Sequence, residues 1–229
     1  MDRVLPIESP DYPARLRDLA NPPDPLFVRG AWDHEGPVVA IVGARSALGD
    51  GLEMARRLAA DLAREGAAVV SGLARGIDAA AHEGALEAGG RTGAVIGTPL
   101  DLVYPPAHRE LQGRVARSLG LMSELPPGAH PTRSTFVSRN RMLAAIADLV
   151  VLVQGDLESG ALRTVEAAER LGRPVGAVPW HAEEPLAAAP HALIHDRRAV
   201  LVRDAADVLE LAGEPRSPLL ATARAAAAG

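Results

Sequence analysis

The fold is decided by the stretch Ser71-Gly72-Leu73-Ala74-Arg75-Gly76-Ile77-Asp78, which joins an apolar run to a segment with helical spacing. Its two glycines allow positive φ angles and a close approach of the backbone to a ligand. The amides of residues 76–78 are expected at a helix N-terminus, where partial positive charge gathers. Arg75 adds a planar guanidinium suited to phosphate. We interpret the stretch as an anion-binding loop; a strand-to-helix turn that needs glycine only for its geometry fits the same pattern.

A second loop of the same kind lies upstream. Residues 38–42 form a continuous apolar run, as expected for a strand buried on both faces, and Gly43-Ala44-Arg45-Ser46 follows directly. Ligands of open parallel sheets bind beyond the carboxyl ends of the strands. Arg45 and Arg75 are therefore predicted to point into one crevice. The glycine spacing matches neither the dinucleotide fingerprint nor a P-loop, which disfavours NAD or ATP binding.

Composition narrows the classes of protein to consider. A chain of 229 residues with 48% hydrophobic content can bury one sizeable core. It has no cysteine, so disulfides and thiolate metal sites are excluded, and its seven histidines lack paired ligand spacing. It shows neither a signal peptide nor a long apolar stretch. We expect a cytoplasmic protein without metal, cofactor or membrane contact.

Charge is unevenly distributed along the chain. The formal net charge is −5, which argues against a protein wrapped in nonspecific nucleic acid. Every basic residue is arginine, which suits bidentate phosphate contacts better than lysine does. Residues 131–141 contain Arg133, Arg139 and Arg141 and no acid. The sequence therefore allows a local basic site on an acidic globule.

Strand-like and helix-like runs alternate along the chain, which predicts an α/β fold with a doubly wound, mostly parallel sheet and helices on both faces. Strands are expected at residues 38–43, 67–71, 92–96, 119–123, 148–153 and 174–178. Helices are expected at about 48–64, 77–88, 107–118, 139–147 and 160–171. Two short apolar runs at 192–195 and 199–202 and a helix over 204–211 complete the predicted fold.

Three regions are predicted from these patterns. Residues 1–36 are rich in proline and carry a short helix-like piece at 12–19, which indicates an N-terminal extension packed on the core. Residues 37–212 form the predicted core domain. Residues 213–229 are punctuated by proline, alanine and arginine, which predicts a disordered tail.

The order of these motifs resembles the DNA-processing protein A (DprA/Smf) family from about residue 11 to residue 211. The landmarks, beyond the two loops above, are Tyr12-Pro13, Leu16, Pro23, Leu26-Phe27, Gly30, Ala80-Ala81-His82, Gly84-Ala85-Leu86, Tyr104-Pro105-Pro106, Ser123-Glu124, Phe136, Arg139-Asn140-Arg141, Ser159-Gly160, Leu162, Thr164, Gly172-Arg173 and Ala177-Val178-Pro179.

The resemblance implies an extended Rossmann-like domain that is not an enzyme. It implies a mediator that binds single-stranded DNA, protects incoming strands and helps to load a RecA-type recombinase in natural transformation, as a homodimer. The residues that it places at the DNA are Gly43, Arg45, Ser71, Gly72, Arg75, Gly76, Phe136, Arg139, Asn140, Arg141, Ser159 and Gly160.

Several of these residues also have a purely structural interpretation. Phe136, in a proline-bounded loop, is either a base-stacking residue or a core plug. Arg139 and Arg141 also fit a solvated helix start, and Ser159-Gly160 fits either an amide cradle or a plain helix cap. Asp78 is expected to support the Gly76 turn. The other conspicuous side chains are expected to pack or to anchor loops: His82, Tyr104 and Trp180.

The chain also departs from the family pattern. Relatives usually continue Arg-Asn-Arg with Ile-Ile-Ala-Gly-Leu-Ser, where residues 142–147 read Met-Leu-Ala-Ala-Ile-Ala, and they carry glycine where Trp180 stands. Asp156 and Glu158 bring acid close to the Ser159 loop. Two alternatives therefore stay open. One is a nucleotide-binding or nucleotide-cleaving enzyme of the lysine-decarboxylase-like (LOG) group, whose Pro-Gly-Gly-x-Gly-Thr loop is missing; the other is an interaction module that has lost DNA binding.

Overall fold

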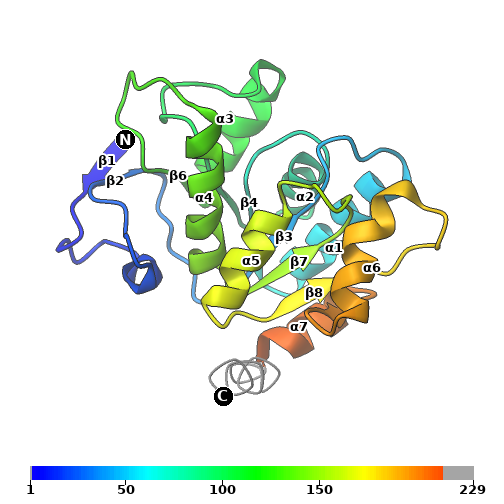
Figure 1. Ribbon diagram of the computed structural model, residues 1–229. Helices are drawn as coiled ribbons and strands as arrows, with labels where there is room; N and C mark the ends of the chain where they lie inside the picture. Colours follow the sequence, from blue (N-terminus) through cyan, green and yellow to red (C-terminus); the bar gives the residue numbers. More distant parts are fainter. Residues whose placement is uncertain (1, 214–229) are drawn as a thin grey trace, which may run out of the picture.

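A nine-stranded sheet forms the centre of the computed structural model, which describes residues 2–213 (Figure 1). The strands are ordered β1-β2-β6-β5-β4-β3-β7-β8-β9, and every neighbouring pair from β6 to β9 is parallel. The protein therefore has the predicted Rossmann-like α/β fold. The strand bounds are β1 Asp2–Leu5, β2 Leu26–Arg29, β3 Val38–Val42, β4 Ala68–Ser71, β5 Thr92–Val95, β6 Gly120–Ser123, β7 Leu149–Leu152, β8 Val175–Ala177 and β9 Val200–Leu201.

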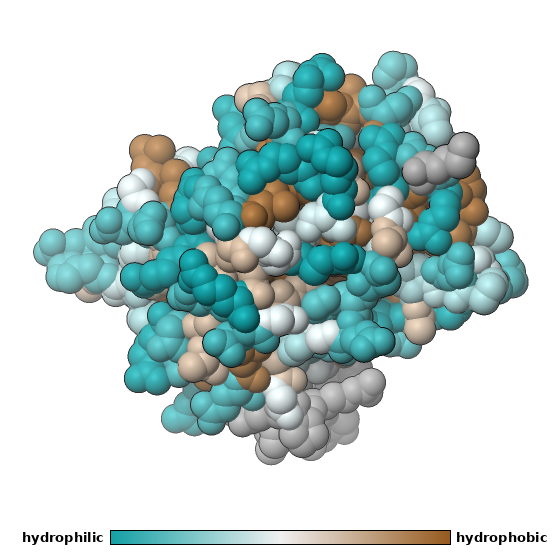
Figure 2. Space-filling view, turned by 180° about the vertical axis from the view of Figure 1, so that it is seen from behind, coloured by the Kyte–Doolittle hydropathy of each residue, from teal (hydrophilic) through white to brown (hydrophobic). Residues whose placement is uncertain are grey.

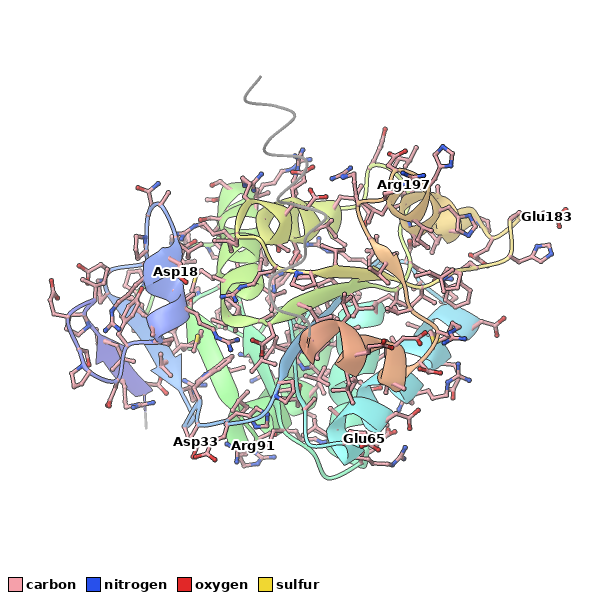
Figure 3. All side chains as sticks on the ribbon, turned by 90° about the horizontal axis from the view of Figure 1, so that it is seen from below. Asp18, Asp33, Glu65, Arg91, Glu183 and Arg197 are labelled. Atoms are coloured by element: carbon pink, nitrogen blue, oxygen red, sulfur yellow. The ribbon has the colours of Figure 1, made fainter. Side chains whose placement is uncertain are left out.

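Helices cover both faces of the sheet, as the view from below shows (Figure 3). One face carries α1 (Asp50–Arg64), α2 (Ile77–Glu87), α3 (Arg109–Arg117) and α7 (Ala205–Gly213). The other carries α4 (Arg133–Ile146), α5 (Leu162–Arg170), α6 (Ala188–His195) and the short helix η1 (Ala14–Asp18). Two further short helices are η2 (Pro106–His108) and η3 (Pro185–Ala187).

The central strands read as continuous apolar runs because successive side chains enter opposite cores. In β3, Val39 and Ile41 pack with the α1 side, whereas Ala40 and Val42 pack with the α4 side. Seen from behind, the outer surface is mainly hydrophilic with scattered hydrophobic groups (Figure 2). The apolar side chains are thus divided between the two layers that flank the sheet.

The N-terminal extension does more than pack on the core, because it widens the sheet by two strands. β1 pairs with β2, and β2 pairs with β6, both antiparallel. The sequence prediction missed β2 because it directly follows a proline-rich stretch that reads as a loop, and it missed β1, which pairs with β2, for lack of a partner strand. Beyond β2, Asp33 forms an ion pair with Arg91 and so ties the connection to the start of β5 (Figure 3).

Helix α4 begins six residues earlier than predicted, at Arg133 instead of Arg139. Thr132 and Thr135 form a capping box, in which each side chain accepts a hydrogen bond from the other residue's backbone N–H. Phe136 therefore lies in the first turns of a helix, and its predicted position in a loop was wrong. The pair of threonines after Pro131 was the signal in the sequence.

The remaining boundaries lie close to those predicted. Residues 192–195 belong to α6, and the run 199–202 contains β9. The predicted tail lies, after Gly213, outside the described residues. No helix within residues 2–213 is long and apolar enough to cross a membrane.

His82 on α2 is a neutral histidine enclosed in the core. Its side chain is fully buried, and its Nδ1 lies 2.7 Å from the Thr92 hydroxyl oxygen. Since that hydroxyl donates its proton to the Val69 carbonyl, the imidazole Nδ1–H must be the donor to Thr92. Burial, with His108 and Arg139 nearby, lowers the pKa of His82 from 6.5 to about 3. His82 thus packs as expected and cannot be protonated without cost.

The first prediction concerns stability in mild acid. The unfolded chain takes up a proton on His82 below pH 6.5 and the folded chain does not, so this residue lowers the free energy of unfolding as pH falls, by about 2 kcal/mol from pH 7 to pH 5. Urea unfolding of the wild type and of His82→Asn at both pH values should show a steeper loss for the wild type. Equal losses, or an imidazole NMR signal that titrates near pH 6.5, would contradict the assignment.

Candidate functional site

A cleft of about 1080 Å3 opens between α4 and α5, beyond the carboxyl end of β3. Its lining comes from residues 42–46 at the end of β3, from α4 as far as Leu143, and from the stretch 156–170 that leads into and through α5. Ala74, Asp78 and Tyr104 complete it. This is the edge at which doubly wound sheets bind ligands. Eight predicted site residues line it: Gly43, Arg45, Phe136, Arg139, Asn140, Arg141, Ser159 and Gly160.

The other four predicted residues, Ser71, Gly72, Arg75 and Gly76, are not among the lining residues. Leu73 has a φ of 58° and is buried in the core, whereas Arg75 is exposed to solvent. The loop thus turns its apolar side chain inward and leaves the arginine outside the cleft lining. Arg45 therefore lines the cleft and Arg75 does not, contrary to the prediction that the two share one crevice.

The amides of the same loop are already engaged by the protein. The buried carboxylate of Asp78 accepts the N–H groups of Gly72 and Ala74, at 3.1 and 3.3 Å. The Ile77 N–H donates to the Ala44 carbonyl at 3.2 Å, an approach that a side chain at Gly76 would obstruct, since its Cβ would lie 2.2 Å from that oxygen. Asp78 supports the turn as expected. Of the amides 76–78 that were predicted to bind an anion, the Ile77 N–H is engaged by the Ala44 carbonyl.

Arg139 is the second member of this buried arrangement. Its side chain is 4% exposed, and its Nη1 donates to the Val95 carbonyl at 2.6 Å. A Cβ on Gly72 would lie 1.8 Å from that Nη1, so glycine leaves the space that the guanidinium fills. Burial lowers the pKa of Arg139 and raises that of Asp78, and the attraction between the two charges opposes both shifts. Arg139 therefore links α4 to the strand ends; it is not the solvated helix start considered from the sequence.

Arg141 and Asn140 also bind other parts of the protein. Arg141 forms a 2.6 Å ion pair with Glu124 and donates to the Asn21 carbonyl at 2.6 Å. Asn140 donates to the Gly160 carbonyl at 3.5 Å and so connects α4 to the segment before α5. The Ser159 hydroxyl accepts the Ala161 N–H at 3.3 Å, although Ala161 itself is the N-cap of α5. The N-cap of α5 therefore lies two residues after Ser159, the residue considered as a cap from the sequence.

Of the exposed arginines that line the cleft, three carry a charge outside any ion pair of the described residues: Arg45, Arg133 and Arg170. Within residues 2–213 none of the three forms an ion pair, whereas Arg163 pairs with Glu166 at 3.0 Å. The sequence prediction did not select Arg133 or Arg170 for the site. Both could have been selected from the sequence, because Arg133 lies in the acid-free stretch and Arg170 follows Arg163 by two helical turns, on the same face of the helix.

Two aromatic rings meet at the cleft. The Phe136 ring is partly buried, packs over Gly97 and lies 5.2 Å from the ring of Tyr104. Both residues line the cleft. Phe136 is therefore neither a fully buried core plug nor a free surface ring.

Comparison with known proteins identifies the family of the chain. The family model described as DNA recombination-mediator protein A matches residues 3–213. The chain belongs to this family. A putative DNA processing protein DprA of Mycobacterium tuberculosis is 41% identical over 203 residues, which cover 87% of this chain and 52% of the relative. The chain thus spans about half the length of that relative.

Two solved structures share the fold closely. DNA processing protein A from Streptococcus pneumoniae superposes with a TM-score of 0.85 at 36% identity, over 91% of this chain and 73% of that one. The protein from Helicobacter pylori, whose structure is described as giving insight into a unique single-stranded DNA binding mode, superposes with a TM-score of 0.82 at 26% identity, over 92% and 94% of the two chains. Among the described residues of this chain no cluster of three or more histidine and acidic side chains could hold a metal ion.

The second prediction tests the buried link between Gly72 and Arg139. A methyl group at Gly72 would displace the Arg139 guanidinium from the Val95 carbonyl, so Gly72→Ala should lower the free energy of unfolding by about 1–3 kcal/mol. Gly113→Ala is the control, because it adds the same methyl group to α3 with its nearest neighbour 3.5 Å away. Urea unfolding should separate the two variants. Equal midpoints would show that Arg139 is free to move.

Proposed function

We propose that the protein binds single-stranded DNA in the cleft between α4 and α5. The observation that carries the proposal is that unpaired arginines and two aromatic rings line the same cleft. Arginines hold phosphates, and aromatic rings stack on bases with little regard to sequence. The described binding mode of the Helicobacter pylori relative supports the same ligand.

The cleft should favour single strands over duplex because a ring can stack only on a base whose face is open. In a duplex the base faces are covered by their neighbours, and only the phosphates remain for the arginines. The net charge of −5 does not oppose binding at the cleft, because screening limits the reach of surface charges to about 8 Å at physiological salt. Asp156 and Glu158 also line the cleft and reduce its positive potential.

The third prediction is a salt-dependent preference for single strands. The logarithm of the association constant should fall linearly with the logarithm of salt concentration, with a slope of about −0.7 per phosphate contact. Arg45→Ala and Arg133→Ala should each weaken binding of all sequences and flatten that slope by about 0.7, since each removes one exposed cleft arginine. Fluorescence anisotropy with a labelled oligonucleotide measures both quantities.

The matched control is Arg57→Ala, which removes the same charge from an exposed site on α1, away from the cleft lining. It should bind like the wild type. Equal affinity for a blunt duplex and a single strand, or binding that ignores salt, would contradict single-strand recognition. If both cleft variants kept the wild-type salt slope, the DNA would have to bind outside this cleft.

The proposed cellular role is that of a recombination mediator, a nonenzymatic homodimer in the cytoplasm that delivers the coated strand to a RecA-type recombinase. The family to which the chain belongs supports the role. Two linked clefts would hold one strand more tightly than either cleft alone, through avidity.

The fourth prediction is that the protein accelerates the formation of RecA-type filaments on strands that it coats, without cleaving nucleotide or DNA. Filament assembly can be followed by the strand-dependent ATPase of the recombinase, with Arg45→Ala as the variant that should lose the effect. Hydrolysis by the pure protein, or filament assembly that is the same with and without it, would overturn this role.

A further inference from the structure

Among the phenylalanine, tyrosine and tryptophan side chains of residues 2–213, only Tyr104 is exposed to solvent. The chain has two tyrosines, two tryptophans and two phenylalanines. Tyr12 and Phe27 are buried, and Trp32, Phe136 and Trp180 are partly buried, whereas Tyr104 is 47% exposed. It stands between β5 and η2 and lines the cleft. An open aromatic ring is therefore present at the proposed DNA site and is not needed to fill the core.

The sequence led us to expect that Tyr104 packs or anchors its loop. Its hydrogen bonding does not support the role of a loop anchor. Its hydroxyl forms no hydrogen bond with another residue of the described chain, in contrast to Tyr12, whose hydroxyl donates to the Pro23 carbonyl at 2.8 Å. The loop around Tyr104 is held by other groups. Thr98 and Gln112 both donate to the Leu102 carbonyl, at 3.4 and 3.3 Å.

Phe136 gives the Tyr104 ring a fixed neighbour. The two ring centres are 5.2 Å apart and the ring planes are inclined by 49°. Phe136 is held in turn by its place in α4 and by its contact with Gly97. Tyr104 is thus supported on one side while the rest of its ring stays open.

We infer that Tyr104 is a second base-stacking residue of the cleft, beside Phe136. This inference rests on the proposed binding of single-stranded DNA. Rings inclined by 49° cannot both lie parallel to one flat base, so the two side chains contact different nucleotides. The ligand is an unpaired nucleobase of any sequence, because every base offers an aromatic face. The aromatic part of the site then spans at least two nucleotides.

Affinity measurements on three variants test the inference. Tyr104→Ala should weaken single-strand binding by about 5- to 150-fold and leave the salt slope unchanged, because it removes a stacking surface and no charge. Tyr104→Phe should keep most of the affinity, since the hydroxyl has no protein partner. Tyr104→Leu, which keeps apolar bulk without an aromatic face, should bind nearly as weakly as the alanine variant. Urea unfolding checks that all three are folded.

A photochemical cross-link identifies the contact directly. Irradiation of the complex with an oligonucleotide that contains 5-iodouracil joins the base to a stacked aromatic side chain. Trypsin cleaves this lysine-free chain after arginine, so Tyr104 falls in the peptide 92–109 and Phe136 in the peptide 134–139. Adducts on Tyr104 are expected in the first peptide, beside adducts in the second.

The outcomes separate the inference from the function on which it rests. Adducts confined to 134–139, together with wild-type affinity of Tyr104→Ala, would overturn the role of Tyr104 and leave single-strand binding intact. Wild-type affinity of Tyr104→Leu would show that bulk suffices and would also overturn the stacking role. Failure of the wild-type protein to bind any single strand would remove both proposals.

Discussion

The cleft depends on one buried electrostatic attraction, between Asp78 at the start of α2 and Arg139 in the middle of α4. Neither charge could be buried alone without a large desolvation cost. Asp78 gathers two backbone N–H groups of the loop after β4, and Arg139 reaches the end of β5. The two charges attract each other from opposite helix layers at the carboxyl edge of the sheet. Through its hydrogen bond to Val95, Arg139 ties α4 to that edge.

The parallel core could be predicted from the sequence because its chemistry is local. Each central strand is a short apolar run, and glycine or an acidic helix start follows several of them, so the six core strands were placed within about one residue. The antiparallel strand β2 could not be placed in this way, because four residues after a proline-rich stretch acquire strand structure by pairing with β1 and β6, which are distant in sequence. The early start of α4 was readable, but only from the reciprocal threonine cap.

The candidate site was predicted less completely, since a residue type does not reveal where its hydrogen bonds go. Arg139 and Arg141 look like the exposed arginines in sequence, yet one is buried against Val95 and the other is paired with Glu124. The loop of residues 71–78 looks like an open set of amides, yet Asp78 accepts the N–H groups of Gly72 and Ala74, and the Ala44 carbonyl accepts that of Ile77. Only the three-dimensional pairing separates arginines that hold the protein together from arginines that remain free for a ligand.

Three side chains of α4 bind other parts of the protein. Arg139 binds β5, and Arg141 binds Glu124 and the N-terminal region. Asn140 binds the segment before α5. Because α4 is held at these points, it has little conformational freedom left to lose when a ligand binds. The entropic cost of ordering therefore falls on the flexible strand and hardly at all on the protein, so the cleft acts as a rigid template to which a disordered polymer must conform.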